Sequence, residues 1–375
     1  MLTARRYPLR TVIGVIRWRS GRVVEVSRRW STALELSVEV TGPGPRGAVP
    51  VRALAYTDVV GEPQVGEEVL LNVTALDLEL GTGGYAMVAA VPGRLPADPE
   101  GPGHLVKARY TPLQMTVLGV DEQDSPHHAL LRDADDLATM PVVTADLHSS
   151  LPAVVAGIRD ARPDATVAYV ATDGGALPLA FSRTVQGLTD AGWLAATVTV
   201  GQAFGGDFEA VTVHNGLLTA RLVVRADVAV VVQGPGNLGT GTTWGFSGTA
   251  VGEAINAAAV LNGRPVGALR VSEADPRERH HGISHHSLTA YGRIAAHPAD
   301  IVVPLLPGDF GALVRDQAKR LAPPHALQDV GLEGLVDALD RCPVPLRTMG
   351  RGMAEDAPAF LAAAAAGRHA ASLLN

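Results

Sequence analysis

A pattern that repeats from residue 140 onward constrains the fold of this chain more than any other feature. Six short apolar runs each lead into a polar loop and then into a segment with helical periodicity. The predicted strands span residues 142–145, 166–171, 195–200, 227–232, 266–271 and 300–303, and the predicted helices span 152–161, 176–191, 209–224, 249–262, 285–296 and 310–321. This alternation predicts a mostly parallel, doubly wound Rossmann-like sheet with helices on both faces.

The first ninety residues have a different texture, with short β-branched runs separated by turn signals. The predicted strands span residues 11–18, 23–27, 33–40, 49–56, 68–74 and 85–91, with a hairpin turn at Ser20-Gly21 and a longer loop at 42–47. Because closure removes exposed strand edges, we predict a small antiparallel β-barrel-like domain. A proline- and glycine-rich linker at 93–103 then divides the barrel domain (1–103) from the α/β domain (104–375), which ends in two or three helices.

The composition limits the classes of function. The chain has 375 residues, of which 47% are hydrophobic and 18% charged, so it can bury a substantial core. Its net charge of −7 argues against nucleic acid or an anionic membrane as the main partner. The single cysteine, Cys342, excludes an internal disulfide framework and a multi-cysteine metal site. No apolar run suggests a signal peptide or a membrane span, so we expect a cytoplasmic protein.

Unusual polar residues follow the predicted strands at the points where those strands end. The residues after the first two strands are Asp146, His148, Asp173, Gly174 and Gly175. Glycine-containing or histidine-containing loops follow the other four strands in the same way. Ligands of open parallel sheets bind at the carboxyl ends of the strands, so we expect these loops to meet around one pocket.

The loop after the fifth strand carries the strongest local signal, four histidines within seven residues. The predicted catalytic residues are Asp275, His280, His281, His285 and His286. Ser284 is expected to cap a helix that begins at His285, and a helix amino terminus disfavours the imidazolium form. Rings there should therefore be neutral near pH 7 and able to accept a proton or to ligate a metal.

Three interpretations of this loop stay open at the level of the sequence. A divalent metal such as zinc, manganese or iron would take a mixed nitrogen and oxygen set, predicted as Asp146, His148 and His285. A site without metal would use the histidines for acid–base chemistry. The third interpretation is a structural turn, in which residues 277–279 form surface ion pairs and the histidines behind them are exposed.

The loop after the fourth strand matches the pattern G-x-G-x-x-G, but no acidic residue ends the next strand as a dinucleotide site would require. Its backbone N–H groups and hydroxyls precede a helix amino terminus, which suits phosphate or carboxylate, with arginines as the countercharge. The predicted ligand-binding residues are Gly234, Gly236, Asn237, Gly239, Thr240, Gly241, Thr242, Asp173, Gly174, Gly175, Arg277, Arg279 and Glu253. The alternatives are glycines that only form tight turns and a Glu253 that only occupies a helix surface.

Five segments together resemble a known family. They are residues 104–114, 173–178, 201–207, 234–248 and 275–286. In combination they are similar to an uncharacterised bacterial family, domain-of-unknown-function family 3866, and the resemblance spans most of the chain. The resemblance implies no reaction, substrate or cofactor, so the candidate residues above rest on their own chemistry.

Two classes of function fit these observations. The first is an enzyme that binds a small anionic molecule, phosphorylated or nucleotide-like, at loop 234–242 and uses the histidines for acid–base or metal chemistry. The second is a non-catalytic sensor of a small ligand, or an assembly protein, that uses the β-barrel to bind a partner. Either is compatible with a homo-oligomer. A stoichiometric metal in the purified protein would favour the enzyme.

Overall fold

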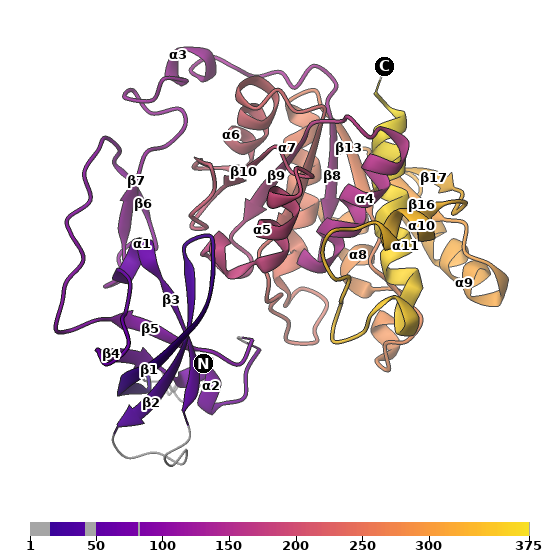
Figure 1. Ribbon diagram of the computed structural model, residues 1–375. Helices are drawn as coiled ribbons and strands as arrows, with labels where there is room; N and C mark the ends of the chain where they lie inside the picture. The colour runs from indigo at the N-terminus through magenta and orange to yellow at the C-terminus, as the bar shows by residue number, and fades with distance from the viewer. Residues whose placement is uncertain (1–15, 42–49, 82, 375) are drawn as a thin grey trace, which may run out of the picture. The chain divides into compact units, whose positions relative to one another are not determined.

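The structure is a computed structural model that describes residues 16–41, 50–81 and 83–374. Its chain divides into two units, Met1–Asp98 and Pro99–Asn375 (Figure 1). Each unit has its own hydrophobic core. Most of the predicted strand at 11–18 and the whole predicted loop at 42–47 lie outside the described residues.

The first unit is a closed barrel with the strand order β1-β2-β3-β5-β4. Its elements are β1 (Trp18–Trp30), β2 (Ala33–Thr41), β3 (Val51–Tyr56), α1 (Thr57–Val60), β4 (Glu68–Asn72), α2 (Thr74–Asp77) and β5 (Ala86–Ala90). The barrel is confirmed, but it is mixed rather than antiparallel, because β3 and β5 pair in parallel. Strand direction cannot alternate all the way around a closed ring of five strands, so one neighbouring pair has to be parallel.

The predicted hairpin turn at Ser20-Gly21 is wrong, since both residues lie inside the continuous strand β1. Gly21 meets a different need there. A Cβ atom at this position would come within 2.5 Å of Val38 Cγ1 on the neighbouring strand. The glycine therefore permits a close contact inside the barrel and does not reverse the chain.

The second unit contains an eight-stranded parallel sheet in the order β11-β10-β9-β12-β8-β13-β16-β17, which confirms the Rossmann-like α/β prediction. Its strands are β8 (Pro141–Ala145), β9 (Val167–Thr172), β10 (Ala196–Thr199), β11 (Phe208–Glu209), β12 (Val228–Gln233), β13 (Arg264–Ala268), β16 (Asp300–Pro304) and β17 (Ala326–Val330). All six predicted strands are present, and β11 and β17 add an edge strand at each side. Two antiparallel pairs lie apart from this sheet: β6 (Leu105–Lys107) with β7 (Met115–Val117), and β14 (Val271–Ser272) with β15 (Gly282–Ile283).

Helices follow the strands in the predicted order. They are α3 (His128–Leu131), α4 (Leu151–Ala161), α5 (Arg183–Asp190), α6 (Val213–Leu218), α7 (Ala250–Val260), α8 (His285–Thr289), α9 (Gly308–Ala318), α10 (Leu335–Asp340) and α11 (Met353–Ser372). Helices α6 and α8 continue into the π-helical turns η3 (Thr219–Val223) and η6 (Ala290–Ile294). Helix α5 begins later than predicted, because Ser182 caps it by accepting a hydrogen bond from the backbone N–H of Val185.

Both faces of the sheet are covered. Val143 and Tyr169 pack in a core cluster that includes α4 and α11, whereas Val142 and Val170 pack in a second cluster with α6 and α7. Figure 1 shows the long helix α11 beside α4. Gly157 of α4 lies so close to the backbone of α11 that a side chain would not fit between the two helices. None of the helices in the described ranges is both long and apolar enough to cross a lipid bilayer.

Candidate functional site

Loops from three neighbouring strands meet at the buried carboxylate of Asp146, which directly follows β8. Asp146 Oδ1 accepts a hydrogen bond of 2.8 Å from Asn237 Nδ2, in the loop after β12. Asp146 Oδ2 accepts from Arg270 Nη1 at 3.0 Å and from His286 Nδ1 at 2.8 Å, both beyond β13. The carboxyl edge of the sheet therefore brings together residues far apart in the sequence, as the parallel topology predicts.

Asp146 stays charged in this position. Only 4% of its surface is exposed, and burial by itself raises the pKa of a carboxyl group. The hydrogen bonds from His286 and Arg270 and the positive charge of Arg270 outweigh this effect, so the pKa of Asp146 is lowered. The carboxylate in turn fixes the tautomer of His286, because an N–H group at Nδ1 must face it. The lone pair of His286 is then left on Nε2.

Three imidazole rings, those of His280, His285 and His286, form a cluster beside this carboxylate. One nitrogen from each ring lies within 4.8 Å of the others, and the ring centroids are 4.5 to 5.1 Å apart. Ser284 organises the cluster: its Oγ accepts a hydrogen bond from the His286 backbone N–H, which caps α8 as predicted. The same hydroxyl is hydrogen-bonded to His280 Nδ1 at 2.7 Å.

Two of these rings are held in the neutral form. Burial, followed by the charges of Arg270 and Arg277, lowers the pKa of His280 to about 3. Burial, followed by His286 and Arg279, lowers the pKa of His285 to about 4. Neutral imidazole is the form that ligates metals or accepts protons.

A cavity of about 470 Å³ opens next to the cluster. Its lining is Leu147, Asn237, Leu238, Gly239, Gly241, Arg270, Arg277, Arg279, His280, His286 and Met349. Three of these side chains are arginines, and none is acidic. The cavity therefore has the charge of a binding site for an anion.

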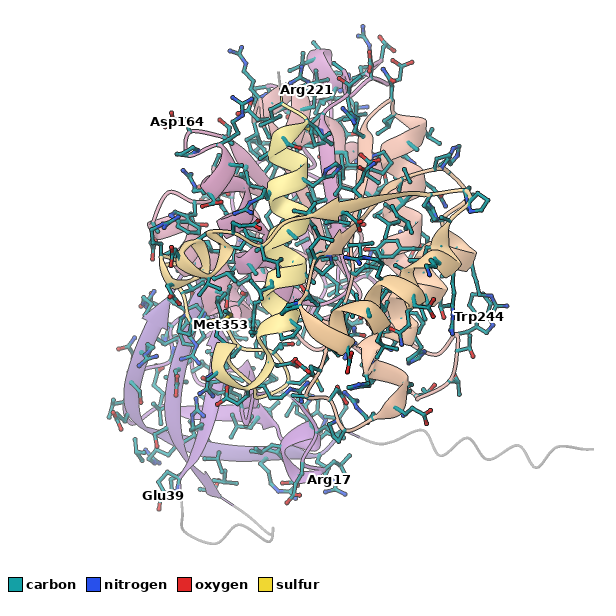
Figure 2. The ribbon with its side chains drawn as sticks, turned by 90° about the vertical axis from the view of Figure 1, so that its right-hand side faces the viewer. Arg17, Glu39, Asp164, Arg221, Trp244 and Met353 are labelled. Carbon is teal, nitrogen blue, oxygen red and sulfur yellow. The ribbon has the colours of Figure 1, made fainter. Side chains whose placement is uncertain are left out.

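The glycine-rich loop that forms one side of this cavity is a short hairpin. Gly239 and Phe246 form a β-bridge, and the Thr240 N–H donates to the Gly245 carbonyl at 2.7 Å. Gly241 adopts a φ of +78° at the turn, a conformation that favours glycine. Figure 2 shows Trp244, from the same hairpin, at the periphery of the second unit.

The structure separates the predicted ligand-binding residues into three groups. Asn237, Gly239, Gly241, Arg277 and Arg279 line the cavity. The second group lies elsewhere: Gly234 and Gly175 are in close contact with one another, Gly174 lies against Gln233, Asp173 accepts a hydrogen bond from the Gln202 N–H, and Glu253 is exposed on α7. Gly236, Thr240 and Thr242 belong to the loop but are not part of the cavity lining.

Two of the predicted catalytic residues, Asp275 and His281, lie outside the histidine cluster and have other partners. Asp275 forms a bidentate ion pair with Arg277, at 2.7 and 2.8 Å, which lowers the pKa of the carboxyl group. It therefore orients an arginine of the cavity. His281 is exposed, with its ring edge-on to Phe310 and its Nδ1 3.2 Å from the Glu273 carbonyl.

His148, predicted as a metal ligand, also lies apart from the cluster. Its Nδ1 faces the Gln233 carbonyl at 3.3 Å and so carries the proton. Its Nε2 accepts a hydrogen bond from Ser182 Oγ at 2.7 Å. Burial lowers the pKa of His148 to about 4, against the opposing effect of the Gln233 carbonyl. Both ring nitrogens therefore have partners within the protein.

Sequence reasoning missed Arg270, which pairs with Asp146 and lines the cavity. The signal was a single charged residue at the end of an otherwise apolar run, placed inside the predicted strand 266–271. It also missed a second, much narrower cavity that shares Leu147, Arg270 and Met349 with the first. Arg351 and Asp356 on its wall form an ion pair at 3.1 Å.

Comparison with known proteins adds one finding. A family model described as "Protein of unknown function (DUF3866)" matches residues 52–367, most of the chain and every residue of the site described above. No curated protein and no solved structure matches.

Proposed function

The chain belongs to that family, and from the geometry of its site we propose that it is an enzyme that binds a small anionic molecule, phosphorylated or nucleotide-like. The anion occupies the cavity beside the glycine-rich hairpin. The histidine cluster then supplies the reactive groups, as proton acceptors or as metal ligands.

The observation that carries this proposal is the charge of the cavity. Asp146 balances Arg270, and Asp275 balances Arg277. No carboxylate among the described residues pairs with Arg279, whose guanidinium lies near Gly241 of the hairpin. One arginine is thus available to a ligand, and the two paired arginines add directed N–H groups.

The reactive end of the site is the wall formed by His280 and His286. Asp146 orients His286 in the way that a carboxylate orients a catalytic histidine, through its Nδ1–H group. The apolar side chains of Leu147, Leu238 and Met349 line the same cavity and suit the uncharged part of a ligand. A ligand with an anionic group and a flat or apolar body fits this lining.

Binding is tested with calorimetric titrations of inorganic phosphate, pyrophosphate, a nucleoside monophosphate and a small dicarboxylate. We expect at least one to bind with an affinity that falls as salt concentration rises. Arg279→Ala should weaken that binding about 10-fold or more, since charge-assisted hydrogen bonds contribute about 1.5–3 kcal/mol. Arg221→Ala is the matched control and should change nothing, because Figure 2 shows Arg221 far from Trp244 and Met353.

Turnover is tested by mass spectrometry of each bound compound after incubation with the protein. We expect chemical change with the wild-type chain and none with His286→Ala, while anion binding persists. A compound that binds and stays unchanged would instead support the non-catalytic sensor. If none of the anions binds, or if Arg279→Ala leaves binding intact, the proposed site is wrong.

A further inference from the structure

We propose that His280, His285 and His286 together bind one divalent transition-metal ion, with Zn²⁺ the best match to their chemistry. The proposal deepens the proposed function, because two of these rings line the anion cavity. It assigns the cofactor of that site and a set of ligands other than the mixed one that the sequence suggested.

The hydrogen bonds of the cluster leave one nitrogen for a metal on each of two rings. Nδ1 of His286 faces Asp146, and Nδ1 of His280 faces Ser284 Oγ. Because the Asp146 carboxylate only accepts hydrogen bonds, the lone pair of His286 is on Nε2, which has no partner among the described residues. In the tautomer in which His280 Nδ1–H donates to Ser284 Oγ, Nε2 of His280 likewise carries a lone pair that is open to a metal. His280 precedes the short strand β15 in the chain and His286 follows it, and Ser284 is hydrogen-bonded to both residues.

The third ring gives an independent observation. Nε2 of His285 is shielded from solvent and has no hydrogen-bond partner among the described residues. A buried polar nitrogen without a partner is unfavourable, and most native structures satisfy such groups. A metal ion between the three rings would satisfy this one.

The hydrogen-bond partners of the cluster are of the kind that metal-binding histidines usually have. A ligating imidazole usually donates its other N–H group to a carboxylate, a backbone carbonyl or a water oxygen, which fixes the ring and raises its basicity. Asp146 meets this need for His286, and Ser284 meets it for His280. Asp146 and Asp275 neutralise two of the nearby arginines, Arg270 and Arg277, so Arg279 is the one whose charge opposes a cation here.

The same hydrogen bonds exclude other candidate ligands. Both ring nitrogens of His148 have protein partners, and the two oxygens of Asp146 accept three hydrogen bonds between them. His281 points elsewhere, toward Phe310. Asp146 is therefore a positioning residue behind His286, and the metal ligands are three nitrogens.

Three nitrogen ligands leave a position open on a tetrahedral ion, as in catalytic rather than structural zinc sites. Ligand nitrogens around tetrahedral Zn²⁺ are about 3.3 Å apart, so metal binding would draw these rings closer than the present spacing. The open position would accept water or an oxygen of the anion. Arg279 and the metal would then bind the same ligand from two sides.

The test uses the full chain, stripped of metal with a chelator and titrated with Zn²⁺ in the absence of any added anion. We expect one ion per chain, and Co²⁺ in place of Zn²⁺ should give the intense visible absorption of a four-coordinate ion. His285→Ala should weaken Zn²⁺ binding more than about 100-fold, since changes to outer-shell partners alone cost 10–100-fold. His281→Ala, from the same loop, should bind as the wild type does.

His148→Ala separates the two ligand sets: it should keep its zinc, whereas the mixed set predicts a loss. Circular dichroism establishes that each variant is folded, and His285→Gln replaces His285→Ala if the smaller side chain disturbs the loop. Substoichiometric binding by the wild type, or unchanged binding by a folded His285 variant, would overturn the assignment. Because the titration contains no anion, a metal site without anion binding refutes only the proposed function, and anion binding without metal refutes only this inference.

Discussion

His148 and the cluster of His280, His285 and His286 lie at the same edge of the parallel sheet but have opposite surroundings. Around His148, both ring nitrogens are hydrogen-bonded to the protein and the ring packs against Tyr169. In the cluster of His280, His285 and His286, one buried nitrogen has no partner and two rings line a cavity. The difference teaches that what marks a candidate site here is a cluster of rings with unsatisfied bonding capacity beside a cavity, and not the residue type.

The buried Lys107 supports the same distinction. Its Nζ donates to the carbonyls of Gly201, Ala203 and Ala210 and lies 3.2 Å from a carboxylate oxygen of Glu209. Burial lowers the pKa of this lysine, as it would for a catalytic amine. Its donors are nevertheless all used within the protein, so Lys107 joins β6 to the segments that follow β10 and β11 as a structural element.

Removing the carboxylate of Asp146 should have the largest effect on stability, because this buried group accepts hydrogen bonds from both Arg270 and His286 of the histidine cluster. Asp146→Ala leaves Arg270 buried without its counter-charge and His286 without its acceptor. Breaking a buried pair from one side typically destabilises by about 3–5 kcal/mol. We expect a loss of this size in the free energy of unfolding, measured with urea.

The matched control is Asp135→Ala, an exposed carboxylate in the segment before β8, which should change stability by less than about 0.5 kcal/mol. Asp146→Asn keeps an acceptor for Asn237 or His286 and should lie between the two. A loss below about 1 kcal/mol for Asp146→Ala would mean that the cluster does not depend on this carboxylate.

The closed environment of His148 predicts a particular dependence of stability on pH. Its pKa in the folded chain is about 4, below the ordinary value of 6.5, so the unfolded chain binds a proton that the folded chain does not. The stabilising contribution is therefore complete above pH 6.5 and is lost as the pH falls toward 4. The shift corresponds to about 3 kcal/mol.

The measurement compares urea unfolding of the wild type and of His148→Gln at pH 7 and pH 4. Other groups titrate equally in both proteins, so the difference between them isolates His148. We expect the wild type to lose about 3 kcal/mol more than the variant over this range. Parallel pH profiles would show that this ring is not held neutral and that the two histidine groups are alike.

Much of the fold was predictable because its signals are local. Apolar runs followed by helical periodicity gave the strands β8 and β12 and, through the parallel topology, the meeting of Asp146 with Asn237. Strand β17 was missed because its residues are half-exposed at the sheet edge and lack an apolar run. Arg270 was missed because the predicted strand 266–271 placed it inside the sheet. The strand β13 in fact ends at Ala268, so Arg270 lies in the loop that follows.

The division between the two histidine groups was not predictable in the same way. His148 and His285 both follow strands and both begin helical turns, so their sequence contexts are alike. What separates them is Ser182, which reaches His148 from the start of α5. A hydrogen bond between residues 34 positions apart leaves no signal in a local pattern.

Ser182 therefore offers a smaller test of the same comparison. Ser182→Ala removes the cap of α5 and the partner of His148 Nε2, each of which contributes about 1 kcal/mol. We expect a loss of about 2 kcal/mol in the free energy of unfolding, with Zn²⁺ and anion binding unchanged. Ser182→Thr keeps the hydroxyl and should recover most of that stability. If Ser182→Ala bound zinc or the anion more weakly, His148 and the histidine cluster would have to belong to one site.

The smallest expected effect concerns the hairpin that borders the open cavity. Trp244 is half-exposed at its tip (Figure 2). The guanidinium of Arg293 lies 4.3 Å from the indole centroid. A cation–π contact at an exposed position contributes about 0.5–1 kcal/mol. This contact fixes a loop rather than the core, so its loss should act on the site and not on global stability.

Trp244→Ala should consequently weaken anion binding about two- to five-fold, which is the same free energy expressed as an affinity. The free energy of unfolding should stay the same. Arg293→Ala should give an equal effect, and the double variant should be no worse than either single one, because both remove one interaction. Leu313→Ala, a partly exposed apolar side chain on α9, controls for the loss of surface area. Additive effects in the double variant would show that the hairpin and η6 act on the anion separately. The Trp244–Arg293 contact would then not order the hairpin wall of the cavity, and this contrast with the fully hydrogen-bonded surroundings of His148 would be lost.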